Sequence, residues 1–162
     1  MNNDSTRFLF RAVDRRHTGT DARMNIEYDK NIQLIVGRTL ESVTNEADES
    51  VVFLCTDGSA FEAYHMQDCC EWVSVHDIIG DLNDLVGKTI TSASAWSSCI
   101  WPSDVTITSA SAWSSYTWTT HIFRADDGTV VQVRWLGVSN GYYSELVYFG
   151  RTQKPIRIDP HE

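Results

Sequence analysis

The chain has 162 residues, of which 42% are hydrophobic and 11% aromatic, a composition that suits one folded domain with a buried core and excludes disorder throughout. Its net charge of −9 excludes nucleic acids and anionic membranes as main partners, because binding either requires a surface of Lys and Arg. No apolar run approaches the roughly eighteen residues that cross a bilayer, so we expect a cytoplasmic protein.

Composition divides the chain into three parts. Residues 1–33 are rich in arginine and show little strand pattern, which indicates a loosely ordered N-terminal extension. Residues 34–150 are expected to form a single β-rich domain, and residues 151–162 a C-terminal tail. Between residues 39 and 123, Lys88 is the only Lys or Arg beside twelve acidic residues, which predicts a negative surface over the middle of the chain.

The domain contains two halves with similar sequence patterns. The segment "VGRTLES" at 36–42 matches "VGKTITS" at 86–92, and in each half an Asp-Gly pair separates two β-branched runs, as in a tight hairpin. Each half is therefore predicted to contribute three strands, mostly in antiparallel sheets. The expected strands span residues 38–44, 51–56, 59–65, 72–76, 88–94, 117–125, 129–136 and 142–149.

One segment between the halves departs from the strand pattern. In "HDIIGDLNDLVG" the aliphatic residues recur every three to four positions, Asp77 is placed to cap a helix and Gly87 to end it. We therefore expect one short helix packed on the sheets, which makes the fold class α+β and β-rich.

The ten letters "TITSASAWSS" occur twice, at 89–98 and at 106–115. In a comparison of the halves, the first copy would run on directly to "YTWTTHIF", and the residues between look inserted. A repeat architecture needs at least about three stacked copies, so we interpret residues 99–115 as a local duplication that lengthens a loop. Deleting them is expected to leave a folded protein.

The densest group of reactive side chains lies in "YHMQDCCEW" at 64–72. These groups are compatible with a ligand-binding site, with a thiol nucleophile beside a histidine, or with a structural turn in which the two cysteines alternate in and out of the core. Acidic neighbours are expected to raise the pKa of the thiols and weaken them as nucleophiles, so no catalytic residue is assigned. A mononuclear metal site from His65, Cys69 and a carboxylate is conceivable, but no CxxC spacing occurs, so no metal ligand or cofactor is assigned. The candidate ligand-binding residues here are His65, Gln67, Asp68, Cys69, Cys70 and Glu71.

A second group lies in "RWLGVSNGYYSE". A guanidinium suits an anionic group and paired tyrosines suit a planar ring, although Asn-Gly equally suits any tight turn. The two groups occupy similar places in their halves, so both would line one cleft if the halves lie side by side. The candidate ligand-binding residues here are Arg134, Ser139, Asn140, Tyr142 and Tyr143.

The blocks "HMQDCCE", "GDLNDLVG", "TWT" and "RWLGVSNGYYS" resemble those of an uncharacterised family of small proteins found in bacteriophages and prophages. The resemblance covers roughly residues 34–149 and leaves out residues 1–33. It implies a phage protein that acts in the host cytoplasm, and it implies no particular activity.

Three functions follow as hypotheses. The first is a phage accessory protein that sequesters a small anionic or nucleotide-like ligand, as in an anti-defence role. The second is an acidic protein that inhibits a basic host protein by direct binding. The third is an enzyme that uses cysteine and histidine. Whether the chain forms a homo-oligomer stays open.

Overall fold

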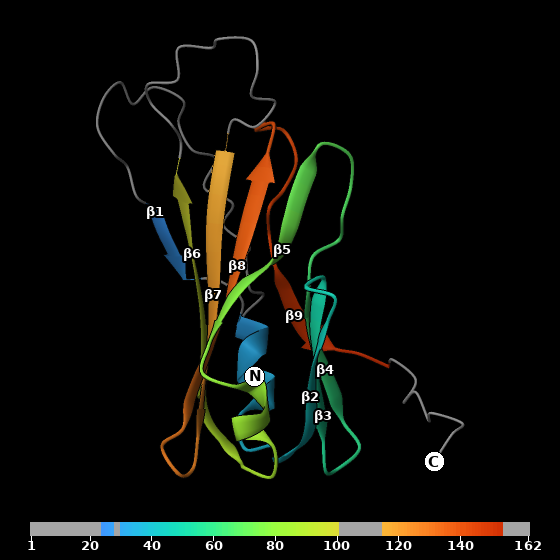
Figure 1. Cartoon of the computed structure of the whole chain (residues 1–162), viewed down its shortest axis with the longest axis vertical. Coiled ribbons are helices and arrows are strands. Elements are labelled where there is room, and N and C mark those ends of the chain that lie inside the picture. Colours follow the sequence, from blue (N-terminus) through green and yellow to red (C-terminus); the bar gives the residue numbers. More distant parts are fainter. Residues whose placement is uncertain (1–23, 28–29, 101–114, 154–162) are drawn as a thin grey trace, which may run out of the picture.

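The computed structural model of the protein describes residues 24–27, 30–100 and 115–153 (Figure 1). Its elements are strands joined by tight turns and two short 3-10 helices. In chain order they are β1 (Met24–Glu27), η1 (Lys30–Ile35), β2 (Leu40–Glu46), β3 (Ser50–Cys55), β4 (Ala60–Tyr64), β5 (Glu71–Ile79), η2 (Leu82–Leu85), β6 (Ile90–Ile100), β7 (Ser115–Ala125), β8 (Val130–Ser139) and β9 (Tyr148–Arg151).

The strands form two sheets whose named pairs are all antiparallel, so the predicted β-rich class is confirmed. Sheet A has the order β1-β6-β7-β8-β5, and sheet B has the order β2-β3-β4-β9. Alternate side chains of both sheets meet in one core, in which Phe53 of sheet B lies 4.8 Å from Phe123 of sheet A, measured between ring centroids. Both 3-10 helices add buried aliphatic side chains to this core.

The predicted helix is present only as η2, because its first residues extend β5. Ile78 and Ile79 pair with β8 as strand residues. Gly80 then turns the chain with φ +95°, and a Cβ there would lie 3.2 Å from the carbonyl oxygen of Val130. The close approach and the positive φ end the strand and leave room for one turn of 3-10 helix, whose first N–H groups Asp81 caps.

The strand predicted at 142–149 is also shorter than expected. The hydroxyl of Ser139 accepts the N–H of Gly141 and donates to the carbonyl of Tyr143, while the side chain of Asn140 accepts the N–H of Tyr142. These bonds fold the residues after β8 into a compact turn. Only Tyr148–Arg151 then pairs as β9.

Where the two halves meet, they make equivalent hydrogen bonds. The N–H of Gly37 donates to the carbonyl of Ile90, and the N–H of Gly87 donates to that of Leu40, at 2.7 and 2.8 Å. Thr39 and Thr89 bridge the halves, with their hydroxyl oxygens 2.8 Å apart. Residues about fifty positions apart here have equivalent bonds, which relates the halves by an approximate two-fold axis.

Equivalent bulges follow in the first strand of each half, between Leu40 and Ser42 and between Ile90 and Ser92. The predicted three-stranded halves are β2-β3-β4 and β6-β7-β8.

Each half also has a fourth strand, and the halves exchange these strands. The strand after β4 is β5, which crosses over to pair with β8 of the other half. The strand after β8 is β9, which crosses back to pair with β4. Apart from β1 at the edge of sheet A, each sheet therefore takes three strands from one half and one strand from the other. The two crossover loops, residues 65–70 and 140–147, meet at one end of the molecule.

Candidate functional site

The two crossover loops bring most of the predicted site residues together. Glu71 pairs with Ser139 at the ends of β5 and β8, and the N–H of Asn140 donates to the carbonyl of Cys70 at 3.2 Å. The two loops meet because the exchange of fourth strands carries both of them across the same end of the sandwich. Of the eleven predicted residues, all but Arg134 lie in these loops or at the strand ends that flank them.

Three of the predicted residues hold the loops in place. The side chains of His65 and Glu71 are 2% and 1% exposed, and His65 Nε2 lies 3.4 Å from Glu71 Oε1. His65 Nδ1 donates to the carbonyl of Leu146 at 2.6 Å, which joins one loop to the other. Gln67 donates its amide to the carbonyl of Val73 at 2.6 Å. These groups are occupied within the protein, so they position the loops.

A second set of groups at this end is exposed. Cys69 and Cys70 are both exposed, so the expected alternation of the two thiols in and out of the core is wrong. Its physical reason is the backbone of Cys70, which has φ +68° and breaks the strand alternation. A hydrogen bond between the Cys70 thiol and Cys69 is the main cause that raises the pKa of the Cys70 thiol, and nearby acidic side chains raise it further. The Cys70 thiol is therefore poorly suited to act as a thiolate nucleophile.

The tyrosines of the second loop lie beside these thiols. Interactions with Cys69, Cys70 and Asp68 raise the pKa of the Tyr143 hydroxyl, so this end of the molecule holds protonated, hydrogen-bonding groups. Tyr142 is 85% exposed, and its ring centroid lies 5.2 Å from that of Tyr143. An exposed ring of this kind is available for contact with a partner.

A buried carboxylate beneath the loops is a residue that the sequence analysis missed. Glu145 is 7% exposed and accepts hydrogen bonds from the hydroxyls of Ser115 and Thr117. Gly137 leaves the room for it, since a Cβ at Gly137 would lie 2.7 Å from the Cβ of Glu145. The sequence signal for this contact was a single carboxylate, Glu145, together with the Ser and Thr hydroxyls of β7.

Arg134 lies elsewhere, on the outer surface of sheet A. Its guanidinium is 4.8 Å from the centroid of the Trp118 ring and 3.6 Å from a carboxylate oxygen of Asp77. Arg134 is five residues before Ser139 on β8, about 16 Å away along the strand. Its side chain points away from the core, whereas that of His65 is buried, so the two do not face one cavity.

Around Arg134, large aromatic side chains cover the outer surface of sheet A. In the same row as Arg134, Trp96 lies two strands away, on the far side of Thr120. Trp118 lies beside Leu136 in the next row, and Trp72 and Tyr116 flank Val138 in the row after that. Trp72 is 60% exposed and Trp96 41% exposed. We call this surface the aromatic face; it consists of Trp72, Ser74, His76, Trp96, Ser98, Tyr116, Trp118, Arg134, Leu136 and Val138.

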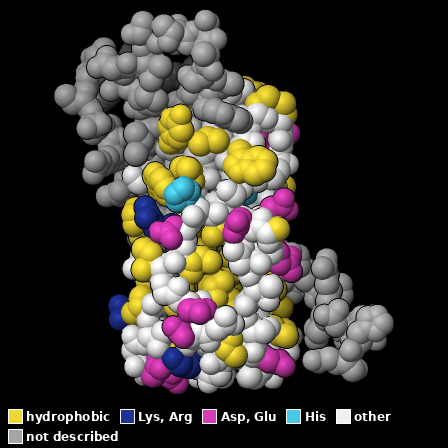
Figure 2. All heavy atoms as spheres, viewed as in Figure 1, with side chains coloured by type: hydrophobic (Ala, Val, Ile, Leu, Met, Phe, Trp, Pro, Cys, Tyr) yellow, Lys and Arg dark blue, Asp and Glu magenta, His cyan; other side chains and the backbone are white. Residues whose placement is uncertain are grey.

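Figure 2 shows hydrophobic side chains gathered over the part of the molecule where the strands of sheet A run, with acidic side chains spread over the rest of this side. Apart from Arg134, the sequence analysis assigned no role to the residues of this face. The signal was their alternation: Trp72 lies between Glu71 and Val73, which point inward, and Trp118 between Thr117 and Thr119, which also point inward.

Sheet B offers no comparable surface among the described residues. Its outward side chains include Thr44, Glu62 and the pair Tyr64 and Tyr148, whose ring centroids are 5.8 Å apart. The part of the chain that the structure describes contains no group of three or more His, Cys, Asp or Glu side chains arranged to hold a metal ion. Within the same residues, no helix has the length and apolar character needed to cross a bilayer.

The fold and its surface define the protein as a two-sheet antiparallel β protein with strands exchanged between its halves and an exposed aromatic face. The chain belongs to the family described as "Domain of unknown function (DUF7448)", whose model matches residues 33–149. This range contains both halves and both crossover loops. Comparisons with curated proteins and with solved structures found no match.

Proposed function

We propose that this protein acts by binding a partner protein through the aromatic face of sheet A. The observation that carries the proposal is the cluster of three tryptophans, a tyrosine and an arginine on the outward side of strands whose inward side already fills the core. Trp, Tyr and Arg are the residues most enriched at the energetic centres of protein interfaces. Contiguous exposed apolar side chains rimmed by polar residues are a feature of protein interaction sites.

The shape of the aromatic face favours a macromolecule. Three rows of residues across four strands cover roughly 200 Å², with strands about 4.8 Å apart. A stable interface buries about 800 Å² on each partner, so the face would form the centre of an interface and the crossover loops its rim. Small ligands usually need a concave site, and this surface is the outer side of a sheet.

Charge indicates the kind of partner. The chain carries a net charge of −9, and Asp77 lies beside Arg134 at the border of the aromatic face. A partner with Lys and Arg around an apolar centre would be attracted over long range and then held by the aromatic side chains. Together with the resemblance to phage proteins, this supports a phage accessory protein that blocks a basic protein of its host, in the host cytoplasm, as an anti-defence function would require.

Capture from a lysate of the host bacterium tests the proposal. Wild-type protein is compared with the variant Trp72→Ser/Trp96→Ser and with Tyr148→Ser, which alters an exposed ring on sheet B instead. We expect the same partner on the wild type and on Tyr148→Ser, loss of it on the double variant, and weaker capture at high salt. Equal capture by all three would overturn the proposal.

A second candidate is a small nucleotide-like ligand, favoured by the contact of Arg134 with Trp118. The guanidinium lies 4.8 Å from the ring centroid, and the Arg134 side chain is 39% exposed. A positive charge and an aromatic ring are therefore available side by side for a ligand. A thermal-shift titration with nucleotide messengers tests it. A saturable rise in melting temperature that Arg134→Gln removes would support this candidate, and no shift with any of them would exclude it.

A further inference from the structure

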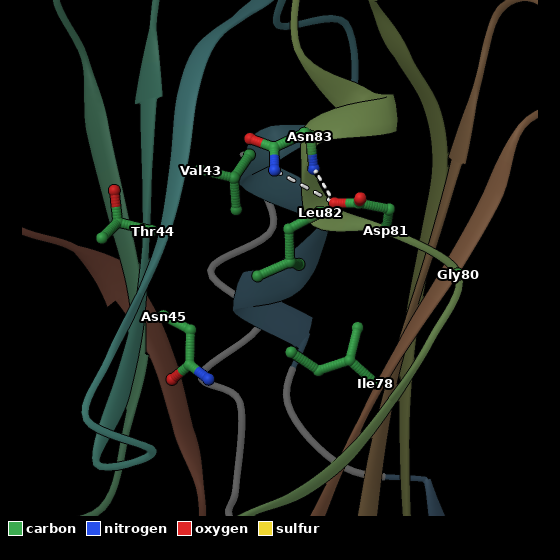
Figure 3. A pocket seen from close by; sticks show the side chains of 8 residues that line it. All are labelled: Val43, Thr44, Asn45, Ile78, Gly80, Asp81, Leu82 and Asn83. Atoms are coloured by element: carbon green, nitrogen blue, oxygen red, sulfur yellow. Dashed lines mark hydrogen bonds between the residues drawn. The ribbon is translucent and has the colours of Figure 1, made fainter.

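A separate hollow lies between the free edges of the two sheets. Its volume is about 370 Å³, and β2, the end of β5 and the start of η2 line it. In Figure 3, Leu82 and Ile78 point from one side toward Val43 on the other, so the walls are apolar. Asn45 and Asp81 supply polar groups, and neither Lys nor Arg lines the hollow.

The equivalent place in the other half is filled by the protein itself. There Gln33 of η1 donates its carboxamide N–H to the carbonyl of Ala93 on β6. At the hollow, the equivalent of Gln33 is Asn83, fifty positions later, and the equivalent of Ala93 is Val43, fifty positions earlier. Asn83 has one methylene fewer than Gln33, and its carboxamide donates to Asp81 Oδ1 at 3.1 Å instead.

We infer that the hollow is a binding site for a glutamine side chain carried on an extended segment of a partner protein. The equivalence of the halves directs the carbonyl of Val43 toward the free edge of β2, as that of Ala93 is directed toward Gln33. An incoming carboxamide would donate one N–H to this carbonyl and the other to the free oxygen of Asp81. The methylenes of the glutamine would lie against Ile78 and Leu82.

The chemistry of the hollow selects a carboxamide over related groups. A glutamate of the same length would bring a second negative charge beside Asp81 and has no N–H to donate. An aliphatic side chain of the same length would give no donor to the carbonyl of Val43 or to the second carboxylate oxygen of Asp81, whose Oδ1 already accepts from Asn83. Because β2 is an edge strand, the segment that carries the glutamine can also lie along it.

Two small compounds provide the test. N-acetylglutamine methylamide and N-acetylglutamate methylamide differ only at the terminal group, and each is titrated into ¹⁵N-labelled full-length protein. We expect the first to shift the amide resonances of residues 43–45 and 81–83 in a saturable way, and the second to shift them with at least tenfold weaker affinity. Equal responses, or no shift of these resonances, would overturn the inference.

Two reciprocal variants complete the test. In Asn83→Gln the longer side chain is expected to reach the carbonyl of Val43, raise the melting temperature and abolish the response to the glutamine compound. In Gln33→Asn the carbonyl of Ala93 loses its donor, so we expect a second set of shifts around Ala93. If Asn83→Gln responds like the wild type, the hollow does not bind a carboxamide in this way. These outcomes do not depend on the aromatic face, which the variants leave unchanged.

Discussion

Gly137 shows how a single residue makes room for the crossover loop. It lies on β8 between Thr117 and Val73 of the neighbouring strands, and the side chain of Glu145 passes directly over it. A methyl group there would meet Glu145 Cβ at 2.7 Å, closer than non-bonded carbons approach. The absence of a side chain at this position therefore allows a buried carboxylate to reach the hydroxyls of β7.

Gly137→Ala is expected to lower the free energy of unfolding by about 1–3 kcal/mol, because the loop or the strand must shift to relieve the contact. Urea denaturation measures this change. Gly150→Ala is the matched control, since a Cβ at Gly150 meets nothing within 4 Å. A loss of stability that is equal in the two variants would contradict this account.

His121 gives the protein a dependence on pH. It is fully buried among the rings of Phe123, Trp135 and Phe149, neither ring nitrogen has a hydrogen-bond partner in the described structure, and burial lowers its pKa to about 4. Above pH 6.5 the histidine is neutral in both the folded and the unfolded chain, so its contribution is fully present. Between pH 6.5 and 4 only the unfolded chain takes up the proton, which lowers stability by about 3 kcal/mol in total.

His121→Phe is expected to remove this loss between pH 6.5 and 4. Denaturation midpoints at pH 7.5, 5.5 and 4.5 measure it. Below pH 4 the exposed carboxylates begin to contribute, since hydrogen bonds from Ser59 hold the pKa of Asp57 at about 2. A wild type whose stability is flat from pH 7.5 to 4.5 would contradict the assignment.

At the scale of elements, local sequence signals were sufficient for the three-stranded halves. The Asp-Gly turns, such as Asp57-Gly58, close hairpins in which the Asp side chain accepts the N–H two residues on, and Gly supplies the positive φ. The fourth strands were harder to place. The sequence analysis ended β5 at residue 76. The spacing of Ile78, Leu82 and Leu85 resembles that of a helix because a strand and a 3-10 turn meet at Gly80.

The positions of the candidate residues were predictable to a similar extent. Both reactive segments fall between a third and a fourth strand, so comparison of the halves was enough to suggest that they meet. The place of Arg134 was not predictable, because it depends on which side of β8 faces the core. The aromatic face was predictable only in part: alternation within β5 and β7 indicates which rings point outward, but their assembly into one surface depends on the register between β5, β7 and β8.

The repeated segment "TITSASAWSS" belongs to this scale as well. Its first copy lies in β6, pairing with β7, whereas residues 101–114, with most of the second copy, lie outside the described residues. We expect the deletion of residues 99–115 to leave a folded protein, since the pairs from Ser92 with Arg124 to Ser97 with Thr119 remain. Its stability should fall, because Ser115 no longer donates to Glu145. Circular dichroism and thermal melting measure both effects, and an unfolded product would contradict the interpretation as an insertion.

At the scale of the whole molecule, the exchange of fourth strands ties the two sheets together. Phe149 lies on β9 of sheet B, yet its ring contacts Phe123 of sheet A as well as Phe53 of sheet B. Neither half can complete a four-stranded sheet from its own strands in this arrangement. The two sheets should therefore unfold in one cooperative transition.

Phe149→Ala is expected to lower the stability of both sheets together, by about 3–5 kcal/mol. The described tryptophans all lie in sheet A, so their fluorescence reports that sheet, while the exchange of amide protons in β3 reports sheet B. The midpoints from the two probes should coincide in the wild type and shift equally in the variant. A separate early transition of sheet B would show that the exchanged strands do not couple the sheets.

The central claim is that the aromatic face of sheet A is the surface through which the protein binds a basic partner. The most direct measurement is the affinity of the purified partner, once captured, for wild-type protein, for Trp72→Ser/Trp96→Ser and for Tyr148→Ser, by calorimetry at one ionic strength. Truncation at the centre of an interface costs about 2 kcal/mol or more per residue, so we predict a loss of at least about a hundredfold for the double variant and little change for Tyr148→Ser. Three equal affinities would contradict the claim.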